Sequence, residues 1–205
     1  MTCLNHASLA ASLAALTVAA DAAAASKPKS PAGKRPAVIV IMTDQQTAGA
    51  ISCAGNPWVR TPAMDALAAD GVRFTRAYCP YPLSGPCRAA LVTGRMPFEV
   101  GAFDNAIRPA DADMQAGIGH RLAEAGYECL YAGKWHVPEV NLPDSGTGFR
   151  RISKMNDPAL ADACDAALKE YDGQKPLFLV ASLLNPHEIC EYGRHETCLL
   201  YTSDA

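Results

Sequence analysis

Residues 37–42 form an uninterrupted run of apolar, mostly β-branched side chains, Ala-Val-Ile-Val-Ile-Met. A run that is apolar at every position is typical of a strand buried inside a parallel sheet, because helices cover such a sheet on both faces. Polar residues 43–46 follow the run directly. The sequence therefore predicts a buried parallel strand with polar side chains at its carboxyl end.

Stretches of strand and helix character alternate along the rest of the chain. Further strands are expected at 72–78, 127–132 and 176–184, and helices at 61–71, 113–125 and 158–171. This alternation predicts an α/β fold with helices on the faces of the sheet. Ligands in such folds bind at the carboxyl ends of the strands, so the polar clusters there are expected to form one site.

Ser84 lies where a proline-rich approach, residues 78–83, gives way to helix-forming residues. Prolines favour an extended chain, whereas the residues from Cys87 onward favour a helix that ends at Gly94. Ser84 is thus expected just ahead of a helix N-terminus, which favours an anion. Arg88, four residues on, can point back toward it. The arrangement fits a nucleophile facing an oxyanion ester, and equally a serine that caps a surface helix.

Other strand ends carry further candidates. Asp44 suits a hard divalent cation, which prefers oxygen ligands, but an aspartate there also fits a turn or a helix cap. Lys134 and His136 are two residues apart and share a face of an extended segment, with Trp135 pointing away. The lysine offers a positive charge and the histidine a proton near neutral pH. The alternative interpretation is a solvated lysine and a packed histidine.

The stretch Ser84–Arg95 reads Ser-Gly-Pro-Cys-Arg-Ala-Ala-Leu-Val-Thr-Gly-Arg. It resembles the sulfatase signature. That signature begins with Cys or Ser, continues with any residue, then Pro, then Ser or Ala, then Arg, and four residues later has Thr or Ser followed by Gly. In that family the first residue is oxidised after translation to formylglycine, and this position is Ser84 here. Cys87 stands where the family usually has Ser or Ala.

The resemblance implies an alkaline-phosphatase-like sheet, mixed but mostly parallel, and a site that binds Ca²⁺, with Mg²⁺ or Mn²⁺ as alternatives. The segments Gly133–His136 and Asn185–His187 are similar to those that supply the family's pocket residues. Gln45 stands where many relatives have a second metal-binding aspartate. The implied catalytic residues are Ser84, Arg88, Lys134, His136 and His187, and the implied metal ligands are Asp44, Gln45 and Ser84.

The implied activity is hydrolysis of a sulfate ester, on a small molecule or a glycan, after a formylglycine-generating enzyme has oxidised Ser84. The hydrated aldehyde carries two hydroxyls: one attacks sulfur, and the other allows sulfate to be expelled by C–O cleavage. An unmodified Ser84 would instead fit a phosphodiesterase or a phosphonate monoester hydrolase of the same superfamily. A non-catalytic relative that binds an anion is the remaining alternative.

The chain ends carry different signals. Residues 1–26 are rich in Ala and Leu and end in small residues, which predicts a signal peptide and export to the periplasm or the medium. Residues 27–36 would be a leader and 37–197 the N-terminal part of a sulfatase catalytic domain. Residues 198–205 resemble a translated sequencing adapter. Because the family's downstream metal ligands are missing, this fragment is predicted to be inactive.

Composition excludes some classes of partner. The net charge is −3 and no basic run occurs, which argues against nucleic acid. Asp21 interrupts the short apolar stretch near the N-terminus, which argues against a membrane span. The eight cysteines include no Cys-x-x-Cys pair, so neither a zinc site nor a disulfide framework is indicated. The cysteines at 53, 79, 129 and 164 are expected to be buried thiols.

Overall fold

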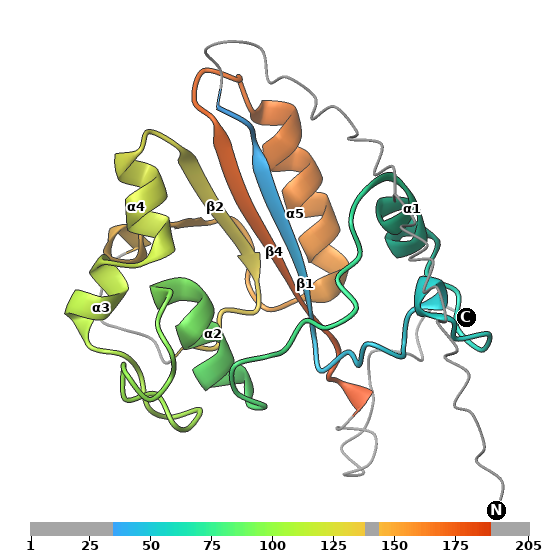
Figure 1. Ribbon diagram of the computed structural model, residues 1–205. Coiled ribbons are helices and arrows are strands. Elements are labelled where there is room, and N and C mark those ends of the chain that lie inside the picture. Colours follow the sequence, from blue (N-terminus) through green and yellow to red (C-terminus); the bar gives the residue numbers. More distant parts are fainter. Residues whose placement is uncertain (1–34, 138–143, 190–205) are drawn as a thin grey trace, which may run out of the picture. The chain divides into compact units, whose positions relative to one another are not determined.

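The computed structural model describes residues 35–137 and 144–189 (Figure 1). These residues contain one four-stranded sheet in the order β1-β4-β2-β3. The strands are β1 (Val38–Asp44), β2 (Glu128–Gly133), β3 (Arg150–Arg151) and β4 (Leu177–Pro186). Every pairing among them is parallel. The predicted α/β fold with a parallel sheet is therefore confirmed.

Helices cover both faces of this sheet, because successive side chains of a strand point to opposite sides. On one face, Tyr131 of β2 and Phe178 of β4 pack with Val92 of α2 (Ser84–Thr93). On this face lies also α4 (Ile118–Glu124), through Leu122. The two faces have separate apolar clusters, so the sheet forms the middle layer.

The opposite face packs against α5 (Asp157–Glu170), the orange helix of Figure 1. Leu160 of α5 lies against Ala132 and Ala181, at the ends of β2 and β4 nearest the site. A proline in the first turn and the Asn156 side chain, which accepts a hydrogen bond from the Ala159 N–H, begin this helix. The helix predicted at 158–171 is confirmed.

The structure corrects the prediction that β1 is a buried strand. Within the described residues β1 pairs with β4 alone, so it lies at the edge of the sheet. Ile41 is 63% exposed, and Ile39 is also exposed. An apolar run shows which side chains can be buried, but a strand is buried on both sides only where it has two neighbours.

The strand predicted at 72–78 is also absent. The segment carries exposed side chains, among them Val72 and Phe74, and pairs with no strand of the described part. A strand needs a hydrogen-bonding neighbour, which local sequence preference cannot supply. Cys79, just beyond this segment, is exposed rather than buried, so the prediction of a buried thiol there is wrong.

Two helix predictions need correction. The helix expected at 113–125 is two helices, α3 (Asp111–Gln115) and α4, because Gly117 between them is extended, with φ −74° and ψ 175°. A Cβ atom on Gly117 would lie 2.7 Å from the Val92 carbonyl oxygen, so the close approach to α2 favours glycine at this position. Helix α2 begins at Ser84 and not at Cys87, and it ends at Gly94 as expected.

The remaining elements are α1 (Pro62–Asp70) and two short 3-10 helices, η1 (Ser52–Ala54) and η2 (Asp144–Thr147). Helix α1 lies at the position predicted from the sequence but buries none of its residues in the described part. Among the described residues there is no helix with the length and apolar character needed to cross a membrane. The predicted signal peptide, leader and C-terminal tail lie outside the described residues, apart from positions 35 and 36.

Candidate active site

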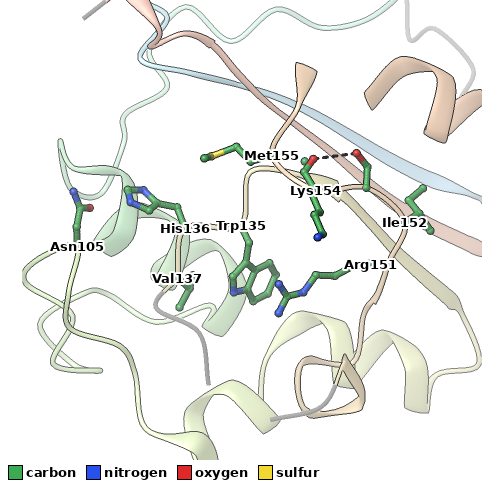
Figure 2. A pocket seen from close by; sticks show the side chains of 10 residues that line it. Asn105, Trp135, His136, Val137, Arg151, Ile152, Lys154 and Met155 are labelled. Carbon is green, nitrogen blue, oxygen red and sulfur yellow. Dashed lines mark hydrogen bonds between the residues drawn. The ribbon is translucent and has the colours of Figure 1, made fainter. Parts of the chain in front are cut away.

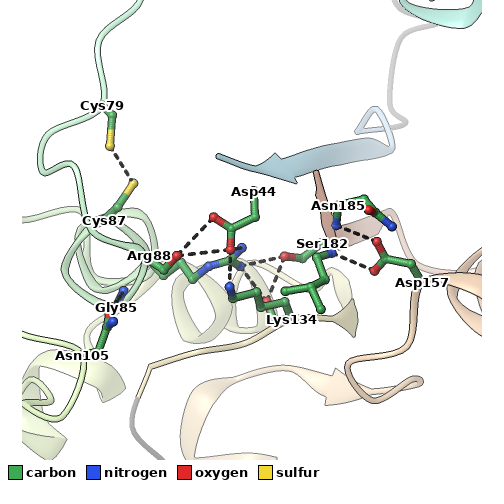
Figure 3. Close-up of polar contacts among 12 residues, drawn as sticks. Asp44, Cys79, Gly85, Cys87, Arg88, Asn105, Lys134, Asp157, Ser182 and Asn185 are labelled. Carbon is green, nitrogen blue, oxygen red and sulfur yellow. Dashed lines mark hydrogen bonds and ion pairs between the residues drawn. The ribbon is translucent and has the colours of Figure 1, made fainter. Parts of the chain in front are cut away.

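The carboxyl ends of β1, β2 and β4 meet the first turn of α2, and charged side chains converge there (Figure 3). Asp44 is the last residue of β1, and Lys134 follows β2 directly. Ser84 and Arg88 come from the first turns of α2. The parallel register of the sheet thus brings together Asp44 and Lys134, which are 90 positions apart in sequence.

Asp44 is the negative centre of this cluster. The Ser84 hydroxyl donates to it and lies 3.1 Å from both carboxylate oxygens. The Lys134 ammonium forms an ion pair with Oδ2, and the Arg88 guanidinium lies 3.5 Å from the same oxygen. Burial opposes the charged form, but the hydrogen bond and charge of Lys134, with Arg88 and Ser84, lower the pKa of Asp44 below its ordinary value. The carboxylate is therefore ionised at neutral pH.

Arg88 is held from three sides although its residue is only 4% exposed. Its Nη1 donates to the Lys134 carbonyl oxygen at 2.6 Å and to Ser182 Oγ at 2.7 Å. Ser182 is fully buried and donates to the same carbonyl at 2.8 Å, as does the Tyr131 hydroxyl at 2.7 Å. These fixed acceptors orient the guanidinium toward Asp44 and Ser84.

Gly133 allows the chain to turn between β2 and Lys134. Its φ is 87°, in the region that favours glycine. A Cβ atom at this position would lie 2.1 Å from the Ser182 carbonyl oxygen and 2.5 Å from Leu160 Cδ1. That carbonyl accepts the Lys134 N–H at 2.8 Å, so the close approach of Gly133 to Ser182 positions the lysine.

The two predicted histidines line different cavities. His187 follows β4 and lines the same cavity as Asp44 and Ser84. Asp157 fixes the strand end before it, because its carboxylate accepts the backbone N–H groups of Leu184 and Asn185, each at 2.7 Å. A residue from the start of α5 thus determines where His187 enters the site.

His136 lines a neighbouring cavity of about 810 Å³, together with Asn105 and Met155 (Figure 2). Its φ is 49°, and its side chain is exposed. Desolvation and the positive charges of Lys134 and Arg88 lower the pKa of His136, against the opposite effect of Asp44. The imidazole is thus neutral at neutral pH and can accept a proton.

The cavity at Ser84 has a volume of about 610 Å³. Its lining includes the three predicted metal ligands, Asp44, Gln45 and Ser84, as well as Arg88 and His187. It also includes both Cys79 and Cys87. Burial and the neighbouring Cys79 thiol raise the pKa of Cys87 to about 12, so this thiol is protonated at neutral pH.

The described residues do not by themselves fit a divalent cation. They contain no group of three His, Cys, Asp or Glu side chains placed to hold a metal. Asp44 already faces two cationic side chains, whereas Ca²⁺ takes six to eight oxygen ligands. A metal at Asp44 needs carboxylates from outside this part of the chain.

Sequence reasoning missed three positions in the site: Tyr131, Ser182 and Asn105. Tyr131 and Ser182 lie inside apolar strands, where an isolated hydroxyl was the only signal. Asn105 lies in a loop and accepts the Gly85 N–H at 2.8 Å, which satisfies one free donor at the start of α2. Only the folded chain shows what these groups contact.

Comparison with known proteins shows the family of the chain and agrees with its fold. The sequence profile of the family described as Sulfatase matches residues 36–198. The chain belongs to the sulfatase family. This confirms the resemblance carried by the stretch from Ser84 to Arg95.

Individual sulfatases match over part of their length. N-acetylglucosamine-6-O-sulfatase of Bacteroides thetaiotaomicron is 40% identical over 133 residues, which are 65% of this chain and 23% of that protein. A solved structure described as a complex with its substrate D-glucosamine-2-N,6-O-disulfate is 28% identical, with a TM-score of 0.66 over 75% of this chain and 35% of the other. This sulfatase chain thus spans about a quarter to a third of the length of such relatives.

An enzyme named for a different activity shares this fold. The phosphonate monoester hydrolase of Agrobacterium radiobacter matches with a TM-score of 0.62 and 21% identity, over 75% of this chain and 41% of that one. At this identity the likeness concerns the fold alone. It agrees with an alkaline-phosphatase-like sheet, of which this sulfatase chain contains a part.

Proposed function

We propose that this chain is the N-terminal part of the catalytic domain of an exported, formylglycine-dependent sulfatase that hydrolyses sulfate esters. The observation that carries the proposal is the position of the Ser84 hydroxyl. It lies at the first residue of α2, 3.1 Å from the Asp44 carboxylate, which also pairs with the buried cations Arg88 and Lys134. This is where a nucleophile can meet an anionic ester.

The charges of the cluster support an anionic substrate. Arg88 and Lys134 carry two positive charges against the single negative charge of Asp44, and both are almost fully buried. A sulfate ester brings one negative charge, which would offset the excess. Free backbone N–H groups at the N-terminus of α2 add to this attraction.

Each residue then has a defined task in the mechanism. Oxidised to formylglycine and hydrated, Ser84 would supply one hydroxyl to attack sulfur as the S–O bond to the alcohol breaks. Deprotonation of the second hydroxyl would then let the C–O bond break, so that the aldehyde forms again and sulfate leaves. Arg88, fixed by Ser182 and the Lys134 carbonyl, holds sulfate oxygens by directed hydrogen bonds. The Lys134 ammonium balances the charge that builds up on those oxygens.

The histidines serve proton transfer and sulfate binding. His136, whose pKa is lowered by desolvation and by the cations beside it, accepts a proton at the stage where a hydroxyl must be deprotonated. His187 lines the Ser84 cavity and is positioned to hold sulfate or to protonate the departing alcohol.

A divalent cation, Ca²⁺ in this proposal, would bind at Asp44, Gln45 and Ser84 with further carboxylates from a longer gene product. The chain covers 23% of the N-acetylglucosamine-6-O-sulfatase that it matches, which leaves most of that protein's length to supply them. The 205-residue chain is accordingly expected to show no turnover.

A sulfated sugar or glycan is the substrate class that we propose. One relative is named as a sulfatase of N-acetylglucosamine, and another is described with a disulfated glucosamine as its substrate. The volume of the second cavity, about 810 Å³ beside His136, leaves room for a sugar next to the sulfate site.

The deciding experiment examines Ser84 itself. The chain is produced with a formylglycine-generating enzyme that accepts serine and then treated with a hydrazide, which labels aldehydes. We expect the label on the tryptic peptide 77–88, none in Ser84→Ala, and unchanged labelling in Ser153→Ala. An unlabelled Ser84 beside a labelled control sulfatase would contradict the proposal and favour phosphoryl chemistry at an unmodified serine.

The catalytic part of the proposal is tested with a longer protein, produced after the source DNA has been sequenced beyond the region that encodes this chain. Hydrolysis of an aryl sulfate should require Ser84, Arg88 and Lys134. Turnover of a phosphonate monoester without turnover of any sulfate ester would assign the chain to the other activity.

A further inference from the structure

Two cysteines flank the nucleophile and face each other. The Cys79 thiol donates to the Cys87 sulfur, with the two Sγ atoms 3.1 Å apart (Figure 3). Cys79 lies on the exposed approach to α2, and Cys87 is half-buried in the first turn of the helix. Ser84 lies between them in the sequence.

The fold holds this pair in place without a covalent bond. The Cys79 thiol also lies 2.7 Å from the Tyr81 carbonyl oxygen, so the approach segment turns back toward the helix. The Cys87 N–H donates to the Leu83 carbonyl at 3.0 Å and anchors the other end. Both sulfurs line the cavity that contains Ser84.

We propose that Cys79 and Cys87 are a disulfide-forming pair, whose oxidation closes a covalent ring around Ser84. A disulfide bond is about 2.05 Å long, so the sulfurs must approach by roughly 1 Å. The exposed segment before Cys79 can follow such a movement, because its side chains pack against little else. The other described cysteines, at 53, 129 and 164, have no sulfur partner among the described residues.

The oxidant is an external disulfide of the glutathione type, or the active disulfide of a thiol oxidoreductase. The Cys79 thiolate attacks one sulfur of that disulfide, forms a mixed disulfide and releases one thiolate. The Cys87 thiol, which is protonated at neutral pH, then loses its proton to water and attacks Cys79 Sγ, which forms the internal bond and releases the second thiol. Two protein thiols lose two electrons and two protons, and the external disulfide gains them.

The ring has a consequence for the site. It joins the approach segment to the first turn of α2 across residues 80–86, so one wall of the Ser84 cavity becomes covalently fixed. A closed ring of this size removes conformational freedom from the unfolded chain. The oxidised chain is therefore expected to unfold at a higher temperature than the reduced chain.

The test uses the full 205-residue chain, made without a formylglycine-generating enzyme. It is incubated with oxidised glutathione, denatured, alkylated and digested with trypsin. Both cysteines and Ser84 lie in one tryptic peptide, 77–88, since no Lys or Arg occurs between Arg76 and Arg88. We expect this peptide to be unalkylated and lighter by two hydrogen atoms, and to take up two alkyl groups after reduction.

Variants distinguish this crosslink from other oxidation. Cys79→Ser and Cys87→Ser should each abolish the internal crosslink, whereas Cys53→Ser should leave it intact. The Tm should rise by roughly 5–10 °C on oxidation of the wild type and not in Cys79→Ser. Two alkylated thiols in peptide 77–88 after oxidation, or a crosslink from either cysteine to another position, would overturn the proposal.

The result does not depend on the proposed sulfatase activity. Oxidation of Ser84 to formylglycine removes the same two hydrogen atoms from the same peptide. Reduction restores the thiols but leaves the aldehyde, and a hydrazide labels the aldehyde alone. A chain can therefore confirm the disulfide and fail the formylglycine test, or the reverse.

Discussion

The charged residues at the site edge of the sheet and the apolar residues on the surface of β1 and α1 have opposite patterns of exposure. At the site edge, the charged residues Arg88 and Lys134 are 4% and 3% exposed. On the other side, the apolar Ile41 of β1 and Leu67 of α1 are 63% and 67% exposed. Charged side chains are normally the exposed ones and aliphatic side chains the buried ones.

The difference shows which side chains of this chain have defined partners. Each buried charge at the site edge has a named partner, because Asp44 faces both cations and Ser182 with the Lys134 carbonyl fixes Arg88. The exposed apolar side chains of β1 and α1 have few partners in the described part. We therefore expect substitutions to matter strongly at the first region and weakly at the second.

The largest expected effect is that of Asp44→Asn. Lys134 and Arg88 would lose the only carboxylate beside them in the described part of the chain and remain as buried, uncompensated charges. We expect a loss of about 3–5 kcal/mol in the free energy of unfolding, measured by urea denaturation. Asp165→Asn is the control, because its ion pair with Lys169 lies on the exposed surface. Equal effects of the two substitutions would contradict the comparison.

Acid should weaken the same region. The folded pKa of Asp44 lies below its ordinary value of 3.8, so its contribution to stability is present above that pH and is lost as the pH falls through the folded pKa. The unfolding free energy of the wild type should therefore fall below pH 3.8, and that of Asp44→Asn should fall less steeply. Parallel pH profiles would show that Asp44 is not the group responsible.

Ser182→Ala should have a smaller but clear effect. It removes a fully buried hydroxyl that accepts from Arg88 and donates to the Lys134 carbonyl. We expect a loss of about 2 kcal/mol, because hydrogen bonds to charged groups are stronger than neutral ones. Ser153→Ala, which removes a less buried hydroxyl bonded to the Lys154 carbonyl, should change stability far less.

The smallest expected effect is that of Leu67→Ala on α1. The side chain is largely exposed, and α1 buries no residue in the described part. We expect a change within about 0.5 kcal/mol. Leu160→Ala on α5 is the matched comparison, since that leucine is 5% exposed and should cost about 2–5 kcal/mol. A large effect of Leu67→Ala would mean that α1 packs against residues outside the described part.

Local sequence patterns predicted the site better than they predicted the edges of the fold. Ser84, Asp44 and Lys134 could be singled out because strand ends and a helix start mark them. The resemblance to the family implied their roles, which stay predictions. The failure at 72–78 and the exposure of β1 share one cause. Strand pairing depends on which other strand lies alongside, and the residues of a single strand do not identify that neighbour.

Ser182 and Tyr131 were missed for a related reason. Each is a single hydroxyl within an apolar strand, and its role in the site depends on a contact with Arg88. Arg88 is 94 positions from Ser182 and 43 positions from Tyr131. Gly117 shows the same limit among the helices, since the Val92 carbonyl that lies close to it belongs to another element. Long-range contacts decide these details.

The hydrogen bonds of Arg88 join α2 to the ends of β2 and β4 through one guanidinium. A helix tied in this way cannot open on its own, because its release would leave a buried cation and two buried acceptors without partners. The amide protons of α2 should therefore exchange with solvent only when the sheet itself comes apart, although the helix has ten residues and begins at an exposed loop. The residue that would hold sulfate thus also makes the helix and the sheet one cooperative unit.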